Sequence, residues 1–219
     1  MSIHLLDSLL LLLLLTACSG PVFGQEPSEQ RKANERPLTL EVRADEPFGK
    51  ATAKEMSTTC ALLDTDIGEI RFEFFPEEAP ETVRNFLNLA ALGAFDTTTF
   101  SRIVRNFVVQ GGNVSTRAEA SVDIRRRANR RIPDEPNRIS HLRGTVSLAR
   151  PEQPNSATSH FFVLVADSTF LDGTFSAFGR VTSGMEVVDR INGMEVDGEK
   201  PLSPVKLKRV SLFQCDSNP

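Results

Sequence analysis

Apolar and charged residues alternate along part of the chain, and the period of the alternation predicts the secondary structure. Every second residue of the segment Ile70–Phe74 is apolar, which is the two-residue period of a half-buried strand. Asp66-Ile67-Gly68, directly before it, suits a hairpin turn. A strand that folds back on a preceding strand is therefore expected here.

The next segment changes to a helical period. Pro80 suits the first position of a helix, apolar residues recur at helical spacing from Val83 to Ala90, and Gly93 suits the C-terminal stop. A second, shorter helix is predicted over Met185 to Ile191.

Apolar segments rich in β-branched and aromatic residues predict the remaining strands. They run over Phe100 to Val104, Phe107 to Gln110, Thr145 to Ala149, Phe161 to Val165, Phe175 to Val181 and Val205 to Phe213. About eight strands with two separated helices, and no β-α-β alternation, predict a mainly β fold. The expected architecture is a closed eight-stranded antiparallel barrel capped by two α-helices.

Composition narrows the possible functions. The 219-residue chain is 40% hydrophobic and 25% charged, which excludes disorder over its full length and suits one domain or at most two. Its net charge of −4 provides no global attraction for DNA or RNA, so no nucleic-acid partner is predicted. Three cysteines without a Cys/His cluster predict neither a disulfide scaffold nor a metal site.

Residues 1–17 predict a cleaved export signal. The leucine run Leu9–Leu15 has the length of a signal-peptide core and is too short to span a membrane as a helix. Thr16-Ala17-Cys18 after it resembles a bacterial lipobox, so the mature chain would begin at a lipidated Cys18. The alternative is an ordinary secretory signal, and residues 1–8 lack the Lys or Arg that usually precedes the core.

Residues 18–55 are polar and contain four prolines, so they bury too little apolar surface to offset the entropy of ordering. A flexible tether is predicted here, followed by a folded domain over residues 56–216. The lipid anchor would place the protein in the cell envelope on the periplasmic side. Ser19 beside the lipidated cysteine would sort it to an outer membrane.

The other two cysteines lie at the ends of the predicted domain. Cys60 opens its first strand and Cys215 closes its last. If the chain ends pair antiparallel, the two residues lie close together, and an oxidising compartment would allow a disulfide. The alternative is two reduced, partly buried thiols.

Three segments place polar residues among the predicted strands. The first, Phe100 to Asn113, ends in a glycine pair and lets Arg102 and Gln110 reach one face from neighbouring strands. The second, Ser147 to Phe162, ends in paired aromatic residues, and the third is Phe170-Leu171-Asp172-Gly173.

In this order and spacing, the segments resemble a cyclophilin-type peptidyl-prolyl cis-trans isomerase over about residues 58 to 215. The pattern is F-x-R-[IV]-[IV]-x-x-F-[VM]-x-Q-G-G, then S-A-T-S-x-F-F, F-L-D-G and F-G-x-V. Arg150 with Ser156-Ala157-Thr158 makes the chain more similar to the bacterial branch. The resemblance implies rotation about X–Pro bonds without covalent chemistry or a cofactor, acting as a monomer on proline-containing segments of unfolded or exported proteins.

The resemblance also implies residue roles. Arg102 would be the donor that stabilises the twisted amide, since its charge is permanent and its fork of N–H groups is rigid. Gln110 and the Ala149-Arg150 backbone would hold the substrate chain extended. The proline pocket would be formed by Phe107, Val108, Phe162 and Leu171.

Four positions depart from the common family pattern. Ser101 and Phe175 replace frequent histidines, His160 replaces a frequent glutamine, and Phe170 replaces the tryptophan of drug-sensitive members. The changes at Ser101 and Phe175 alter the polarity of the rim and not the central donor, so catalysis is expected. Substrate preference stays open, as does cyclosporin affinity, since Phe170 lacks the indole N–H donor. His160 would make the groove sensitive to pH, or would simply replace one hydrogen-bonding group by another.

Two other functions compete with this reading. A serine hydrolase requires a Ser, His and acid constellation, but only His141 and His160 follow the signal region and no G-x-S-x-G motif exists. The stronger alternative is a module that binds proline-containing segments with little turnover.

The arginine cluster over Arg125 to Arg131 is expected in an exposed loop. It would be a solvated surface, or a site for anionic lipids or acidic clients.

Overall fold

The computed structural model describes residues 46–215, which belong to one compact unit of the chain. The predicted signal segment, Cys18 and most of the predicted tether lie outside the described residues.

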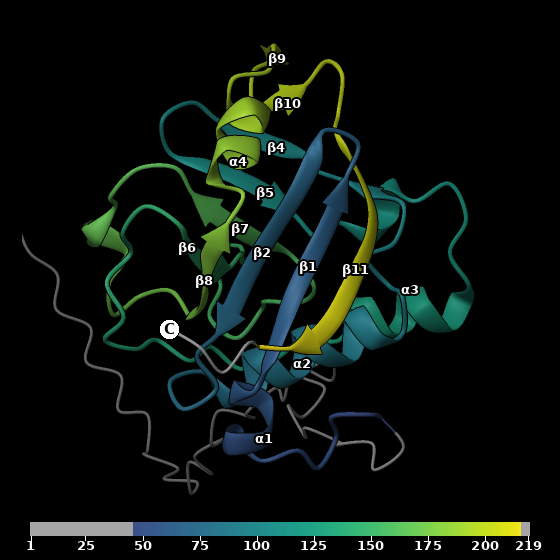
Figure 1. Cartoon of the computed structure of the whole chain (residues 1–219), viewed down its shortest axis with the longest axis vertical. Coiled ribbons are helices and arrows are strands. Elements are labelled where there is room, and N and C mark those ends of the chain that lie inside the picture. The colour runs from purple at the N-terminus through teal and green to yellow at the C-terminus, as the bar shows by residue number, and fades with distance from the viewer. Residues whose placement is uncertain (1–45, 216–219) are drawn as a thin grey trace, which may run out of the picture. The chain divides into compact units, whose positions relative to one another are not determined.

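A nine-stranded antiparallel sheet dominates this unit (Figure 1). Its strands in spatial order are β3 (Thr98–Thr99), β11 (Lys206–Gln214), β1 (Thr59–Thr65), β2 (Gly68–Phe74), β8 (Ala177–Ser183), β6 (Thr145–Leu148), β7 (Phe161–Leu164), β5 (Val108–Gly111) and β4 (Arg102–Val104). Two short strands, β9 (Val196–Asp197) and β10 (Lys200–Pro201), form a separate hairpin.

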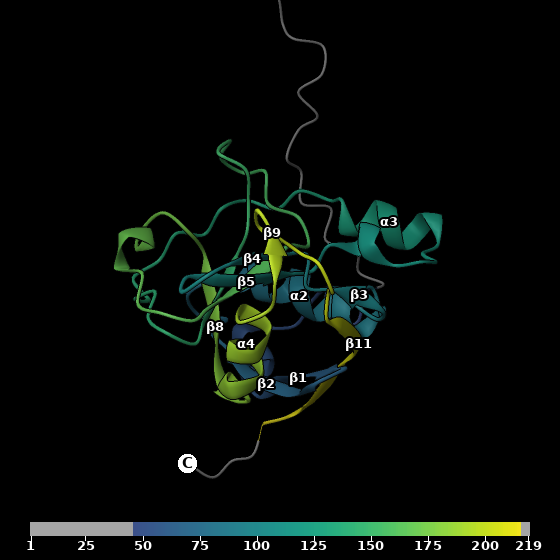
Figure 2. The same cartoon turned by 90° about the horizontal axis from the view of Figure 1, so that it is seen from above.

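The helices are short and lie outside the sheet. They are α1 (Ala53–Ser57), α2 (Pro80–Ala91), α3 (Val122–Ala128) and α4 (Met185–Asn192), with 3-10 turns η1 (Val114–Thr116) and η2 (Thr169–Leu171). In Figure 1, α4 lies toward the upper end of the sheet and α2 toward the lower end. Figure 2 shows α3 projecting from the side of the unit.

The sheet curls but remains open, because its edge strands β3 and β4 do not pair with each other. Only Phe100 and Ser101 separate these strands along the chain. Phe100 N donates to Val205 O at 3.0 Å and Ser101 N donates to Gln110 O at 3.0 Å, so the chain passes from one partner strand to another. The predicted closed eight-stranded barrel was therefore wrong: chain continuity, and not a ladder of hydrogen bonds, joins the two edges.

The first hairpin follows the predicted pattern. Strands β1 and β2 pair from Cys60 opposite Glu73 to Thr65 opposite Gly68, which leaves a two-residue turn. Thr65 Oγ1 donates to Gly68 O at 2.6 Å and supports this turn. Gly68 has φ +142°, and a Cβ there would approach Val187 to 2.8 Å, so the turn requires glycine.

An aromatic cluster fills the inside of the sheet. Its rings lie in pairs with centroids 4.9 to 6.4 Å apart, distances typical of favourable aromatic contacts. The members are Phe72, Phe74, Phe86, Phe95, Phe161 and Phe178, from three strands, α2 and the loop after α2. The interior is therefore packed with side chains, and any binding site must lie elsewhere.

The folded unit begins before the predicted boundary at residue 56. Thr52 and Glu55 form a capping box at the start of α1, which places that boundary inside a helix. The Glu46 carboxylate binds Arg127 of α3 through two hydrogen bonds, and Phe48 packs against the main core.

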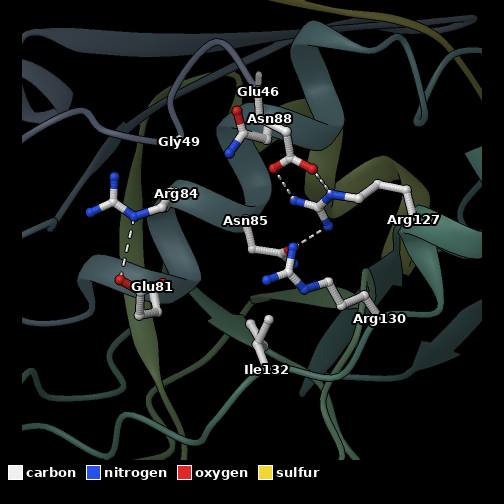
Figure 3. Close-up of a pocket in the computed structure, with 9 residues that line it drawn as sticks. All are labelled: Glu46, Gly49, Glu81, Arg84, Asn85, Asn88, Arg127, Arg130 and Ile132. Atoms are coloured by element: carbon white, nitrogen blue, oxygen red, sulfur yellow. Dashed lines mark hydrogen bonds and ion pairs between the residues drawn. The ribbon is translucent and has the colours of Figure 1, made fainter. Parts of the chain in front are cut away.

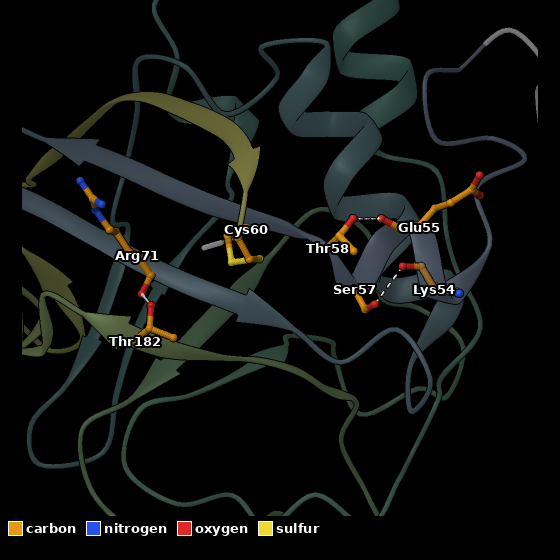
Figure 4. Close-up of a disulfide and its surroundings, with 8 residues drawn as sticks. Lys54, Glu55, Ser57, Thr58, Cys60, Arg71 and Thr182 are labelled. Carbon is orange, nitrogen blue, oxygen red and sulfur yellow. Dashed lines mark hydrogen bonds between the residues drawn. A yellow bond between two sulfur atoms is a disulfide. The ribbon is translucent and has the colours of Figure 1, made fainter. Parts of the chain in front are cut away.

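A disulfide joins Cys60 to Cys215, whose Cα atoms lie 5.1 Å apart (Figure 4). Cys215 N also donates to Thr58 O at 2.9 Å and continues the pairing of β1 with β11. The first and last strands of the unit are thus cross-linked.

Candidate active site

The candidate site lies on the outer face of the sheet, where strand alternation separates two sets of side chains. Val109 of β5 and Val163 of β7 point into the main core. Val108 and Phe162 on the same strands belong to a second apolar cluster, together with Leu164 and Leu171.

A groove of about 840 Å³ runs over this outer face. All eleven residues predicted to act on substrate line it: Arg102, Phe107, Val108, Gln110, Ala149, Arg150, His160, Phe162, Phe170, Leu171 and Phe175. Six further residues that were not predicted for the site complete the lining: Asn129, Arg131, Pro151, Gln153, Ser156 and Thr158. Of these, Ser156 and Thr158 belong to a motif that the sequence had singled out.

Arg102 lies opposite Gln110 in the β4–β5 ladder, the arrangement that strand alternation predicted. The Arg102 side chain is 38% exposed and opens to the groove, while its neighbour Ile103 is buried in the core. Arg102 Nη1 donates to Gln110 Oε1 at 3.4 Å. The guanidinium thus lines the open groove.

Glu199 holds the other edge of this guanidinium. Arg102 Nε donates to Glu199 Oε2 at 2.6 Å, and Nη2 donates to Oε1 at 3.1 Å. The hydrogen bonds from Arg102, with its charge, lower the pKa of the Glu199 carboxyl. The carboxylate therefore stays ionised near neutral pH.

Gln110 continues the hydrogen bonds across the groove. Its Nε2 lies 3.5 Å from His160 Nδ1. Because Gln110 Oε1 accepts from Arg102, Nε2 is the donor toward His160, and Nδ1 must be the unprotonated acceptor. Burial lowers the pKa of His160, which favours this neutral form.

Aromatic rings form the apolar end of the groove. Phe162 is buried and meets Phe175 edge to face at 6.0 Å, while Phe107 lies 5.7 Å from Phe170. The Phe170 ring is the most exposed large apolar side chain of the described residues, at 74%. A buried floor with an exposed aromatic rim suits a small apolar ring such as proline.

A hydrogen-bonded network of Asp172, His141 and Ser147 supports the wall of the groove that carries Leu171. Asp172 Oδ1 accepts from His141 N at 2.7 Å and lies 2.9 Å from His141 Nδ1, and His141 Nε2 lies 3.1 Å from Ser147 Oγ. The bond from His141 N is the main cause of the lowered pKa of Asp172.

The network of Asp172, His141 and Ser147 contains the residue types of a hydrolytic triad, which the sequence analysis did not expect. Ser147 and His141 are nevertheless both 0% exposed, so no substrate reaches the hydroxyl. The constellation therefore positions the loop after β7 and does not support a serine hydrolase.

Arg150 is held in place from several sides. Its Nε lies 3.0 Å from Asp134 Oδ2, with both side chains largely buried, and its guanidinium carbon lies 5.1 Å from the Phe175 ring centre. Arg150 Nη1 also donates to Pro151 O at 3.0 Å. The Arg150 side chain thus supports the groove wall.

A second cavity, between residues 46–49 and α2, measures only about 20 Å³ (Figure 3). Figure 3 shows Arg127 pointing at Glu46 and at Asn85, to which its Nη1 donates at 2.7 Å. The space is about that of a single water. This polar cluster is structural, and the large groove is the candidate active site.

Comparisons with known proteins show the family of this chain. The family model for cyclophilin type peptidyl-prolyl cis-trans isomerases matches residues 60–212. A peptidyl-prolyl cis-trans isomerase A of Dickeya dadantii is 36% identical over 172 residues, which are 75% of this chain and 87% of that protein. The chain belongs to the cyclophilin family. It is accordingly a peptidyl-prolyl cis-trans isomerase.

Other relatives and solved structures agree on the family. An isomerase of Acinetobacter baylyi is 31% identical and covers 74% of this chain and 89% of its own length. A crystal structure of a Cryptosporidium parvum cyclophilin is 26% identical with TM-score 0.63, over 74% of this chain and 99% of that chain. A second structure with that title was determined in the presence of the dipeptide Ala-Pro.

Two further features of this cyclophilin concern residues 46–215. Within this range no three or more His, Cys, Asp and Glu side chains converge to hold a metal ion. No helix of the same range is long and apolar enough to cross a membrane.

The sequence analysis missed the residues that support the cyclophilin groove through long-range contacts. Glu199 lies 97 positions from Arg102 and belongs to no family motif quoted above. Asp134, the partner of Arg150, sits in an irregular segment without a periodic pattern. Nothing in the local sequence marked either carboxylate.

Proposed function

We propose that Arg102 is the catalytic donor of this isomerase and that the aromatic end of the groove grips the proline ring. Rotation about the X–Pro bond takes the amide nitrogen out of conjugation, and its lone pair then accepts a hydrogen bond. A rigid cationic donor aimed at that nitrogen favours the twisted amide over both planar forms. The observation that carries this assignment is the guanidinium, fixed on both edges, beside the buried cluster of Val108, Phe162 and Leu171.

The energetic demand fits non-covalent catalysis. The barrier to rotation is about 18–20 kcal/mol, and uncatalysed exchange takes about 10–100 s. Millisecond exchange requires about 7 kcal/mol less, since each factor of ten in rate corresponds to about 1.36 kcal/mol. Gln110 and the backbone at Ala149 would hold the peptide extended, so that proline binding and donor alignment act together.

The test compares the wild type with Arg102→Ala in a protease-coupled assay on an X-Pro peptide. We expect kcat/KM to fall about a hundredfold, as for loss of one transition-state donor. Arg71→Ala is the matched control, because Arg71 is a half-exposed strand arginine paired with Glu69 at 3.2 Å outside the groove. An Arg102→Ala protein with unchanged kcat/KM would refute the assignment.

The alternative is a module that holds proline-containing segments with little turnover. It predicts that the wild type and Arg102→Ala both leave exchange at the uncatalysed rate while each still binds an unfolded client. The ordered bonds of Arg102 to Glu199 and Gln110 favour turnover, since a binding surface requires no oriented donor.

We further propose that the isomerase is a bacterial lipoprotein, monomeric and held by a lipid on Cys18 at the periplasmic side of the outer membrane. The leucine run, the Thr16-Ala17-Cys18 sequence and Ser19 support this placement. The Cys60–Cys215 disulfide is in keeping with an oxidising compartment. Its clients would then be proline-containing segments of exported proteins.

Mass spectrometry of the mature protein tests the anchor. A diacylglycerol-modified Cys18 at the N-terminus is the expected result. An unmodified N-terminus a few residues away would instead indicate an ordinary secretory signal.

A further inference from the structure

The β9–β10 hairpin brings a carboxylate to the proposed catalytic arginine. Asp197 pairs with Lys200, so Gly198 and Glu199 form a two-residue turn. Gly198 has φ +61°, the left-handed conformation that glycine adopts without strain. Glu199 is therefore placed by a tight turn and not by a long flexible loop.

The backbone of this turn is fixed to the strand that carries Arg102. Ile103 N donates to Glu199 O at 2.8 Å, one residue beyond Arg102. Leu202 N donates to Glu195 O at 2.9 Å and closes the base of the hairpin. The carboxylate and the guanidinium thus start from two backbones that are hydrogen-bonded to each other.

The contacts of the guanidinium divide its donors into two groups. An arginine has five N–H groups. Two bind the Glu199 oxygens at 2.6 and 3.1 Å, and a third, on Nη1, binds Gln110 at 3.4 Å. One N–H remains on each terminal nitrogen, so the atoms left for a peptide are the two at the tip of the side chain.

We propose that Glu199 is a positioning residue for the isomerisation: its carboxylate holds Arg102 so that the two remaining N–H groups face the substrate amide. This inference rests on the proposed role of Arg102. Without Glu199, the guanidinium would keep its charge and its strand position but would sample several rotamers, since a free arginine side chain has about 2 kcal/mol of rotamer entropy. Only a fraction of the molecules would then present the donor to a twisted amide.

The solvent exposure of the Arg102–Glu199 ion pair distinguishes a positioning role of Glu199 from a role in stabilising the fold. The Arg102 and Glu199 side chains are 38% and 56% exposed. Exposed ion pairs contribute little to folding. Loss of Glu199 should therefore change the catalysed rate and leave the unfolding midpoint nearly unchanged.

The test measures a proline-containing peptide by NMR, with cis–trans exchange giving the catalysed rate and a titration giving Kd. For Glu199→Gln we expect the exchange rate at saturating peptide to fall about tenfold, with Kd within about twofold, because orientation matters in the transition state more than in the ground state. Asp197→Asn is the matched control: the same charge is removed from the same hairpin, at a residue whose side chain, unlike that of Glu199, forms no hydrogen bond with Arg102 within the described residues. It should exchange at the wild-type rate.

A second variant pair shows whether Glu199 acts through Arg102. In an Arg102→Ala background, Glu199→Gln should cause no further loss. An equal tenfold loss in that background would overturn the inference. So would an unchanged or faster rate in the single variant, since a faster rate means that the carboxylate competes with the substrate. If the wild type itself does not accelerate exchange, the proposed function of Arg102 fails first.

Discussion

At the scale of single residues, the groove depends on the direction of its hydrogen bonds. Gln110 accepts from Arg102 on one side and donates toward His160 on the other. This direction holds only while His160 Nδ1 is unprotonated. A protonated ring would place a donor against the Gln110 amide and favour rotation of Gln110 away from Arg102.

Activity should therefore fall at acid pH, and His160→Gln should remove the fall. Burial lowers the pKa of His160 below the ordinary 6.5. Between 6.5 and that lower value, the unfolded chain binds a proton that the folded chain does not, so stability decreases as the pH falls. Catalysis should be lost as the pH passes through the lowered pKa itself.

The measurement is a pH profile of kcat/KM for both proteins. We expect kcat/KM of the wild type to decline as the pH falls through the lowered pKa of His160, while kcat/KM of His160→Gln stays flat over the same pH range. The same acid decline in both proteins would assign the titration to another group.

The residue scale also shows what sequence alone reveals about the site. Arg102, Phe107 and Gln110 occupy short motifs: pairing of β4 with β5 places Arg102 opposite Gln110, and Phe107 reaches the groove from the turn between these strands. Glu199 is different, because its place depends on how a distant hairpin folds against β4. A sequence motif can mark residues that contact a common ligand. It does not mark a carboxylate such as Glu199, whose position is set by tertiary contacts.

At the scale of elements, the first and last strands act as one cross-linked pair. Cys60 and Cys215 enclose a separation of 155 residues. Replacing both by serine should lower the free energy of unfolding by about 2–4 kcal/mol, because the unfolded chain regains loop entropy. Urea unfolding with and without the disulfide measures this change.

Activity provides the control for that experiment. Strands β1 and β11 do not contribute residues to the groove, so kcat/KM of the folded double variant should equal that of the wild type. A loss of activity without a loss of stability would contradict the separation of the disulfide from the site.

Elements with strong periodicity were predictable, and short ones were not. The helix from Pro80 and the one from Met185 follow their apolar spacing, as do the longer strands. The five-residue α1 and the two-residue β3 are set by a capping box and by pairing with β11, which no apolar period reveals. The arginine cluster also differs from the expected loop, since part of it forms α3 with Ser121 as its N-cap.

At the scale of the whole folded unit, residues 46–51 are an integral part. Arg127 pairs with Glu46, and Arg84 Nη1 donates to Phe48 O at 2.8 Å and to Ala51 O at 2.6 Å. Both arginine side chains are at most 16% exposed. Glu46→Gln should therefore lower the free energy of unfolding by about 2–4 kcal/mol, since it weakens a largely buried ion pair.

The test compares the urea unfolding midpoint of Glu46→Gln with that of Glu69→Gln. Glu69 pairs with Arg71 at the surface, where both side chains are about half exposed, so its loss should cost less than about 0.5 kcal/mol. Equal midpoints for the two variants would show that residues 46–51 only rest on the surface.

The two edge strands of the curled sheet, β3 and β4, are very short, and each is capped by a hydrogen bond from another segment of the described residues. Thr99 N of β3 donates to Thr116 Oγ1, and Ile103 N of β4 donates to Glu199 O in the hairpin. Exposed strand edges are the usual template for pairing with another chain and for aggregation. Because both edges are short and capped, pairing of this sheet edge to edge with a second chain is disfavoured.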